Sequence, residues 1–195
     1  MLHRIREACK EDNLDNDLFF GTIEADEAYI GGKEKNKHAS KKQNVGGRTT
    51  GKTVVLGMGS RSGQLKATAA PNNGKTIRDV IKETACVNSV LCTDEHPSYE
   101  GMPKYRHKTV CHSAKHFVDG TAHTNGIESA WAVLKRVCYS IYRAFSKKHP
   151  QLRLNESAPR LNSGNVKFHA LGRIDALLRM CAWKRLLHAT LVNAL

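Results

Sequence analysis

The sequence lacks any apolar run near the ~20 residues that a membrane-spanning helix needs. Its first residues, MLHRIREACKEDN, are too polar and charged for a signal peptide. The six cysteines include no C-x-x-C pair, so a disulfide framework is not expected. We therefore expect a reduced, cytoplasmic chain with no membrane partner. No repeat or linker divides the 195 residues, a length that fits one domain with a sizeable core.

Acidic residues are also scarce, because 18 Asp and Glu stand against 31 Lys and Arg, for a net charge of +13. Such an excess on a short chain favours a polyanionic partner, with nucleic acid the first candidate. Much of it lies in residues 31–52, which have the composition of an exposed loop. That loop either binds phosphates and releases counterions or is only solvated. The predicted DNA contacts are Lys33, Lys35, Lys37, Lys41, Lys42, Arg48 and Lys52, with Arg136 from a later helix.

Hydrophobic periodicity predicts alternating strands and helices. Beyond residue 146 the pattern is again helical, but Pro150 and Pro159 are expected to break that helix. The order of elements predicts an α/β domain with a mixed sheet flanked by helices. The expected elements are a short helix in 1–12, a strand over 19–30, a hairpin over 52–70, a helix over 73–85, strands over 89–94 and 104–112, a long helix over 124–145 and a helical tail over 171–195.

Three acids fall within or at the ends of these elements. Asp26 lies in the first strand, Asp94 ends a later strand, and Glu128 lies one turn into the long helix. Carboxylates from separate elements can hold divalent ions for phosphoryl transfer. Two alternatives remain open: a chain with 18 acids places some at element ends by chance, and the helix dipole favours a carboxylate at its N-terminus.

The long helix carries an unusual face within TNGIESAWAVLKR. Glu128, Trp131 and Lys135 are spaced i, i+3 and i+7, so they share one side of the helix. An i, i+7 pair is too distant for a direct salt bridge, which weakens the explanation of this face as an ordinary surface ion pair. A zinc site formed by Cys111, His112, His116 and His123 is less favoured, because their spacing fits no structural zinc pattern.

Three motifs, IEADEAYIGGKEKNKH, LCTDEHPSYEGMPKY and HTNGIESAWAVLKR, closely resemble in this order the DDE transposases of bacterial insertion sequences. The nearest group is numbered fifteen ninety-five, and its catalytic domain opens with D-E-x-Y-x-G-G. The resemblance extends from residue 2 to about 185. It implies an RNase H-like fold and a two-metal site that uses Mg²⁺ or Mn²⁺. It further implies cutting and joining of DNA at transposon ends and targets, with a homo-oligomer as the active complex.

The resemblance also implies roles for individual residues. Asp26 and Asp94 match the first and second acids and the metal ligands, and Glu128 matches the third. Lys135 matches the basic residue seven positions later. The resemblance thus implies that this face of the long helix belongs to the active site, with Trp131 packed between Glu128 and Lys135 or against DNA. Some members of the group are described with asparagine in the third role, so Asn125, one turn before Glu128, is kept as a second choice.

Compared with full-length relatives, the chain is expected to lack a zinc-ribbon and helix-turn-helix region. The expected division is 1–17, a remnant of a DNA-binding helix; 18–165, the catalytic domain; and 166–195, a helical tail. Two other functions stay open: an inactive, truncated DNA-binding remnant, and an RNase H-like nuclease acting on RNA–DNA hybrids. The motif contexts do not suggest the nuclease.

Overall fold

The computed structural model of the chain describes residues 6, 18–32, 34–42, 49, 51–69, 74–110, 123–141, 149–162, 171–172, 174–175 and 178–179, with only the backbone at 35, 74–76 and 159. The predicted N-terminal helix, apart from residue 6, lies outside these residues. So do three of the four zinc candidates, Cys111, His112 and His116. No helix in the described part of the chain is both long enough and apolar enough to span a bilayer.

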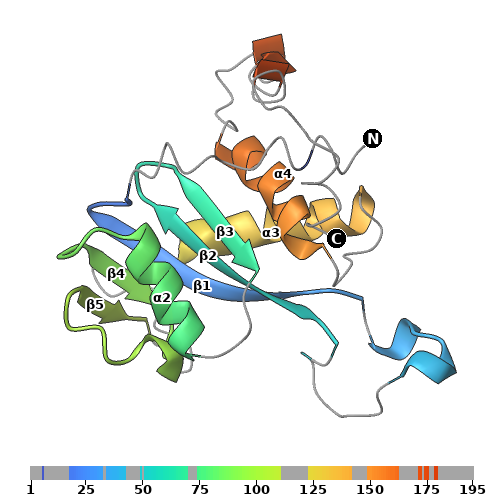
Figure 1. The fold of residues 1–195 in the computed structure, drawn as a ribbon, viewed down its shortest axis with the longest axis horizontal. Coiled ribbons are helices and arrows are strands. Elements are labelled where there is room, and N and C mark those ends of the chain that lie inside the picture. The colour runs from blue at the N-terminus through green and yellow to red at the C-terminus, as the bar shows by residue number, and fades with distance from the viewer. Residues whose placement is uncertain are drawn as a thin grey trace, which may run out of the picture.

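A five-stranded sheet in the order β3-β2-β1-β4-β5 forms the middle layer (Figure 1). β1, β2 and β3 are antiparallel neighbours, whereas β4 and β5 run parallel to β1. The strands are β1 (Thr22–Ile30), β2 (Thr53–Ser60), β3 (Leu65–Ala69), β4 (Val90–Thr93) and β5 (Arg106–Thr109). The helices are α2 (Gly74–Thr84), α3 (Asn125–Ser140) and α4 (Pro150–Asn162), with short 3-10 helices η2 (Glu34–Asn36), η3 (Ala39–Lys41) and η4 (Pro97–Tyr99). This mixed sheet with flanking helices confirms the predicted α/β, RNase H-like fold.

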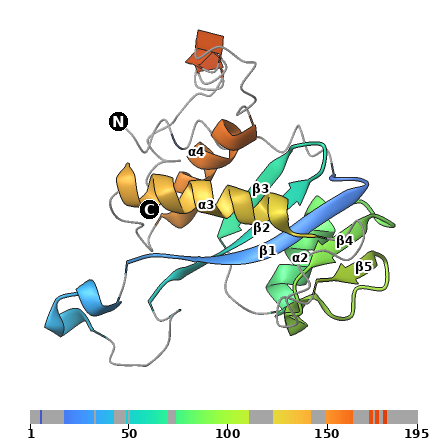
Figure 2. The same cartoon turned by 180° about the vertical axis from the view of Figure 1, so that it is seen from behind.

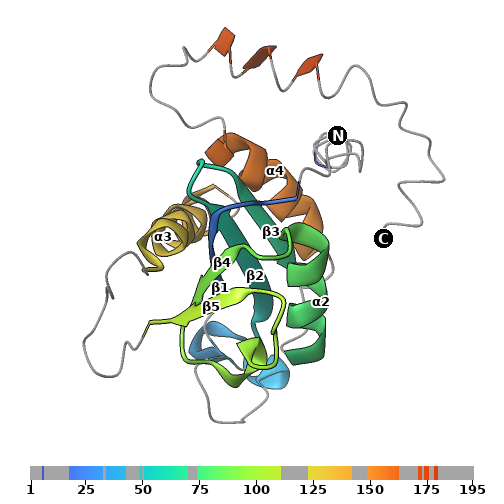
Figure 3. The same cartoon turned by 90° about the vertical axis from the view of Figure 1, so that its left-hand side faces the viewer.

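Each face of the sheet has its own apolar core, because side chains alternate along a strand. From β1, Ile23 and Ala25 belong to the cluster that includes residues of α2. Ala28 and Ile30 belong to a second cluster with residues of α3 and α4. Figure 3 shows α2 and α3 on opposite sides of the sheet.

α3 lies across the back of the sheet, over β1 and β2 (Figure 2). Gly57 on β2 permits this close approach, because a Cβ there would lie 2.4 Å from the ring of Trp131. Real Cβ atoms essentially never come so close to another heavy atom. The glycine therefore sets how deeply the indole packs, and with it the height of α3 above the sheet.

α4 contradicts the expectation drawn from the prolines. The helix runs without interruption from Pro150 through Asn162 and includes Pro159. Pro150 occupies the first helical position, where its missing N–H has no helical partner to lose and its fixed φ suits the helix. The predicted break was therefore wrong: the first proline stands where a helix tolerates it, and the helix continues through the second.

Polar side chains of α4 also cover the edge strand β3. Gln151 accepts a hydrogen bond from Ala69 N at 2.9 Å and donates one to Ala67 O at 3.2 Å. Asn162 accepts a hydrogen bond from Leu65 N at 2.7 Å and donates one to Leu65 O at 3.0 Å. These amides satisfy the edge of the sheet, where unpaired strand groups would otherwise be exposed.

Candidate metal and catalytic site

Asp26 and Asp94 are brought together by the parallel pairing of β1 with β4. Glu24 is in register with Cys92, so continuing the register by two residues places Asp26 beside Asp94. β4 ends at Thr93, and Asp94 is the next residue. The site thus lies at the carboxyl end of a strand, where open α/β sheets generally bind ligands. The sequence predicted both acids, and the strand register makes them neighbours.

A third carboxylate, from Glu27, lies in the same group. Oxygen atoms of Asp26, Glu27 and Asp94 all lie within 4.8 Å of one another. One oxygen of Glu27 is buried and has no hydrogen-bond partner within the described part of the chain. Sequence reasoning assigned Glu27 no role, although it follows Asp26 directly in the D-E-x-Y-x-G-G motif. That adjacency is the signal that could have identified it.

Burial, together with neighbouring acids, raises the pKa of two members of this group, Asp26 and Glu27. Burial raises the pKa of Asp26 from 3.8 to about 6, and the charges of Asp94 and Glu128 add to the rise. Burial likewise raises the pKa of Glu27, with further increases from Asp94 and Asp26, whereas the nearby Tyr99 hydroxyl lowers it. Both shifts mean that negative charge is unfavourable in the metal-free site. A bound cation would relieve that unfavourable charge.

Hydrogen bonds hold two of these acids in place. The backbone N–H of His96 donates to Asp94 Oδ1 at 3.1 Å. The indole N–H of Trp131 donates to Asp26 Oδ2 at 3.0 Å, and this bond partly offsets the rise in the pKa of Asp26. Trp131 is only 4% exposed, so it packs inside the protein and orients a carboxylate instead of presenting its ring to DNA.

Glu128 lies in the first turn of α3, outside the tight group of three acids. Its Oε1 accepts a hydrogen bond from the Thr124 hydroxyl at 3.0 Å. Its charge contributes to the raised pKa of Asp26, so the two carboxylates interact electrostatically. Asn125 is exposed in the same turn. Lys135 is exposed further along the helix, and in the described residues it forms no hydrogen bond or ion pair with these acids.

Only some of the predicted DNA contacts can be placed. Lys41, Lys42 and Arg136 are exposed, and Lys52 is half-buried. Lys37 forms an ion pair with Glu34 across η2, in the segment between β1 and β2. Lys33 and Arg48 and the side chain of Lys35 lie outside the described residues. Of the zinc candidates, His123 is described, and its Nδ1 lies 3.2 Å from Glu24 Oε1.

A comparison with known protein families matches the part of the chain that contains these acids. The family model for the ISXO2-like transposase domain matches residues 19–162, which include all five strands and the three acids Asp26, Asp94 and Glu128. No curated protein and no solved structure matches the chain. The model covers well over half of the sequence and confirms the resemblance carried by the three motifs. The chain therefore belongs to the ISXO2-like family of DDE-type insertion-sequence transposase domains.

Proposed function

We propose that this transposase domain cleaves DNA at the ends of an insertion sequence and joins those ends to target DNA. The observation that carries the proposal is the proximity of Asp26, in the middle of β1, to Asp94, which directly follows the parallel strand β4. The catalytic unit is proposed to extend over 18–165, with 166–195 as a helical tail. It is proposed to work in the cytoplasm as a homo-oligomer.

The chemistry of the site fits two divalent cations, Mg²⁺ or Mn²⁺. Mg²⁺ prefers oxygen ligands and uses few carboxylates while retaining water. Asp26 and Asp94 offer such oxygens within 4.8 Å of each other, and the buried, unpartnered oxygen of Glu27 lies in the same group. Glu128 is proposed as the third ligand, with Asn125 as the second choice. When bound, the ions supply activation of the attacking oxygen and stabilisation of the leaving oxygen.

The protein's own residues supply position and charge. Trp131 orients Asp26, the His96 N–H orients Asp94, and the Thr124 hydroxyl orients Glu128. Such outer hydrogen bonds typically change metal affinity or activity by about 10- to 100-fold when they are removed. Lys135 is proposed to bind the DNA backbone near the site, because it follows Glu128 by two turns on the same helix.

DNA binding beyond the site is proposed to come from the basic residues between β1 and β2, together with Arg136. Lys41 and Lys42 are exposed within or next to η3, and the described part of this segment carries the short helices η2 and η3 away from the sheet (Figure 1). Contacts of this kind neutralise phosphates without reading sequence, so they would hold DNA of any sequence near the acids.

The test is cleavage of a labelled duplex that carries the inverted repeats flanking the gene, beside a scrambled duplex, in Mn²⁺ and in EDTA. We expect metal-dependent nicking that Glu128→Gln abolishes, because the amide removes the charge of the third ligand. Glu83→Gln is the matched control: the same chemical change on an exposed residue of α2. Nicking that survives in Glu128→Gln while Asn125→Ala removes it would move the third ligand to Asn125.

Two other results would redirect the proposal. DNA and Mn²⁺ binding without any nicking would indicate an inactive DNA-binding remnant. Cleavage of an RNA–DNA hybrid in preference to duplex DNA would indicate a nuclease.

A further inference from the structure

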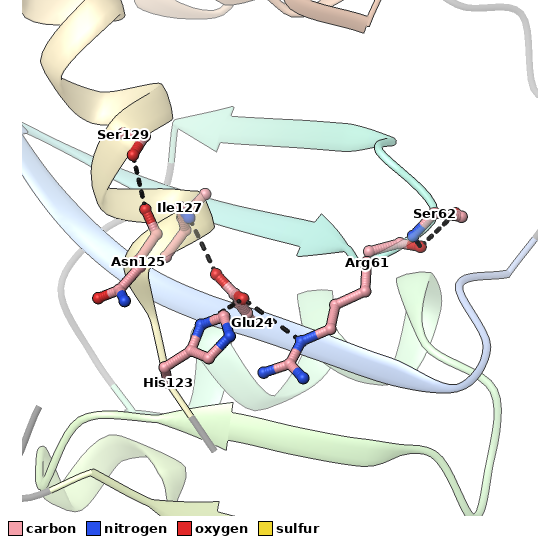
Figure 4. Close-up of polar contacts among 8 residues, drawn as sticks. Glu24, Arg61, Ser62, His123, Asn125, Ile127 and Ser129 are labelled. Carbon is pink, nitrogen blue, oxygen red and sulfur yellow. Dashed lines mark hydrogen bonds and ion pairs between the residues drawn. The ribbon is translucent and has the colours of Figure 1, made fainter. Parts of the chain in front are cut away.

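Glu24 is a buried acid on the same face of β1 as Asp26, two residues earlier in the strand. It is 4% exposed, and neither the proposed metal chemistry nor the core explains it. Three nitrogen atoms surround its carboxylate, one from the turn after β2 and two from the beginning of α3 and the residue before its N-cap (Figure 4). These are Ile127 N at 3.0 Å, His123 Nδ1 at 3.2 Å and Arg61 Nε at 3.7 Å.

The contact with Ile127 is a helix cap supplied from a distant strand. The first N–H groups of an α-helix have no partner inside the helix, and the side chain of the N-cap residue usually accepts from the second or third of them. Ile127 is the third residue of α3, and Glu24 accepts from its N–H. The N-cap residue, Thr124, makes no side-chain capping bond, and its hydroxyl donates instead to Glu128.

We propose that Glu24 is a positioning residue for the third acid, Glu128, an inference that rests on the proposed function. By accepting from the Ile127 N–H, Glu24 links the first turn of α3, which carries Glu128, to β1, which carries Asp26. Without Glu24 this link between strand and helix is lost, and the first turn of α3, with Glu128, can shift relative to Asp26. β1 thus supplies both the first acid and the contact that places the third.

The spacing between strand and helix is consistent with this role. Gly126 directly precedes Ile127 in α3. A Cβ at this position would lie 2.7 Å from Glu24 Oε2. Glycine is a poor helix former, so its place in the first turn needs a reason such as this close approach. An ion pair with Arg61 alone would need no glycine at this position.

Loss of Glu24 should not by itself prevent folding. A groove of about 450 Å³ is lined by Glu24, Arg61, Gly126 and Ile127. A groove of that size admits water, which can hydrogen-bond the Ile127 N–H in place of the carboxylate.

The test measures Mn²⁺ binding by electron paramagnetic resonance, a readout independent of DNA cleavage, in Glu24→Ala, Glu24→Gln and Gly126→Ala. We expect Glu24→Ala to weaken Mn²⁺ binding by about 10- to 100-fold, as for other residues that orient metal ligands. Glu24→Gln should weaken binding less, because its amide oxygen can still accept from Ile127. Gly126→Ala should weaken binding by displacing the carboxylate, while far-UV circular dichroism shows α3 retained, because alanine favours helix.

Two comparisons separate positioning from general damage. Gly59→Ala is the matched control: Gly59 lines the same groove, and a Cβ there meets nothing within 4 Å. In the Glu24→Ala background, Gly126→Ala should weaken Mn²⁺ binding no further, because the two changes act on one shared interaction.

Wild-type Mn²⁺ affinity in both Glu24→Ala and Gly126→Ala would overturn the inference. Loss of Mn²⁺ binding in Asp94→Asn would then leave the proposed function standing. A wild-type protein that binds no Mn²⁺ would overturn the proposed function, and this inference with it.

Discussion

Asp94→Asn is expected to stabilise the metal-free protein while abolishing its response to metal. Asp94 lies within 4.8 Å of Asp26 and Glu27, and at pH 8 the carboxylates repel one another. Two unit charges at that distance interact by about 1 kcal/mol in water and about 3 kcal/mol at the effective dielectric of a protein surface. The amide removes this repulsion and retains an oxygen that can accept the 3.1 Å hydrogen bond from His96 N.

The metal-free variant should therefore unfold at a higher temperature than wild type. For a chain of 150–250 residues, each kcal/mol raises the midpoint by about 2–4 °C. Metal should stabilise the wild-type protein more than the variant. At a concentration 100 times its dissociation constant, a metal ion stabilises the folded wild type by about 2.7 kcal/mol, whereas the variant lacks a ligand and should gain little.

Differential scanning calorimetry at pH 8, in EDTA and in Mn²⁺, measures both effects. Asp79→Asn is the control, because Asp79 lies on α2 with half of its side chain exposed and is only 3.6 Å from Lys82 Nζ. Asp79→Asn should change the metal-free unfolding midpoint by no more than a degree or two. It should leave the shift caused by Mn²⁺ unchanged. A metal-free Asp94→Asn protein less stable than wild type, or one with an undiminished Mn²⁺ shift, would refute the reasoning.

The metal-free protein should lose stability as pH rises from 4 to 6. The pKa of Asp26 is raised to about 6, so the folded state binds more protons than the unfolded state in this range. Urea unfolding should show a free energy of unfolding that falls with pH, and Asp26→Asn should make this dependence weaker. Gly57→Ala should destabilise the protein by about 1–3 kcal/mol through overpacking against the indole, whereas Gly59→Ala, with open space for its Cβ, should be nearly neutral in thermal melts. Replacing Lys41 and Lys42 with alanine should flatten the slope of log affinity for DNA against log salt by about 0.9 for each phosphate that the protein no longer neutralises, and an unchanged slope would mean that these side chains are only solvated.

Local pattern was enough to predict most of the elements. The apolar alternation around Asp26, the turn between β2 and β3 and the apolar stripe of α2 each reflect a periodicity that the sequence states directly. The same reasoning was wrong about α4, in which Pro150 occupies the tolerated first position and Pro159 lies within an unbroken helix. Leu152 and Leu154 are buried in its first turns, and Leu154 belongs to the apolar cluster that includes residues of β1 and β2.

The sequence by itself determined which residues carry charge and which elements carry them: Asp26 on a strand, Asp94 after one, Glu128 on a helix. Tertiary structure decided which of them meet. Strand register, a property of pairing between segments 68 residues apart, places Asp94 beside Asp26 and brings Glu27 into the group. The cap on α3 comes from Glu24, 103 positions away in the chain. No local pattern can specify such contacts, because each depends on the packing of two elements against each other.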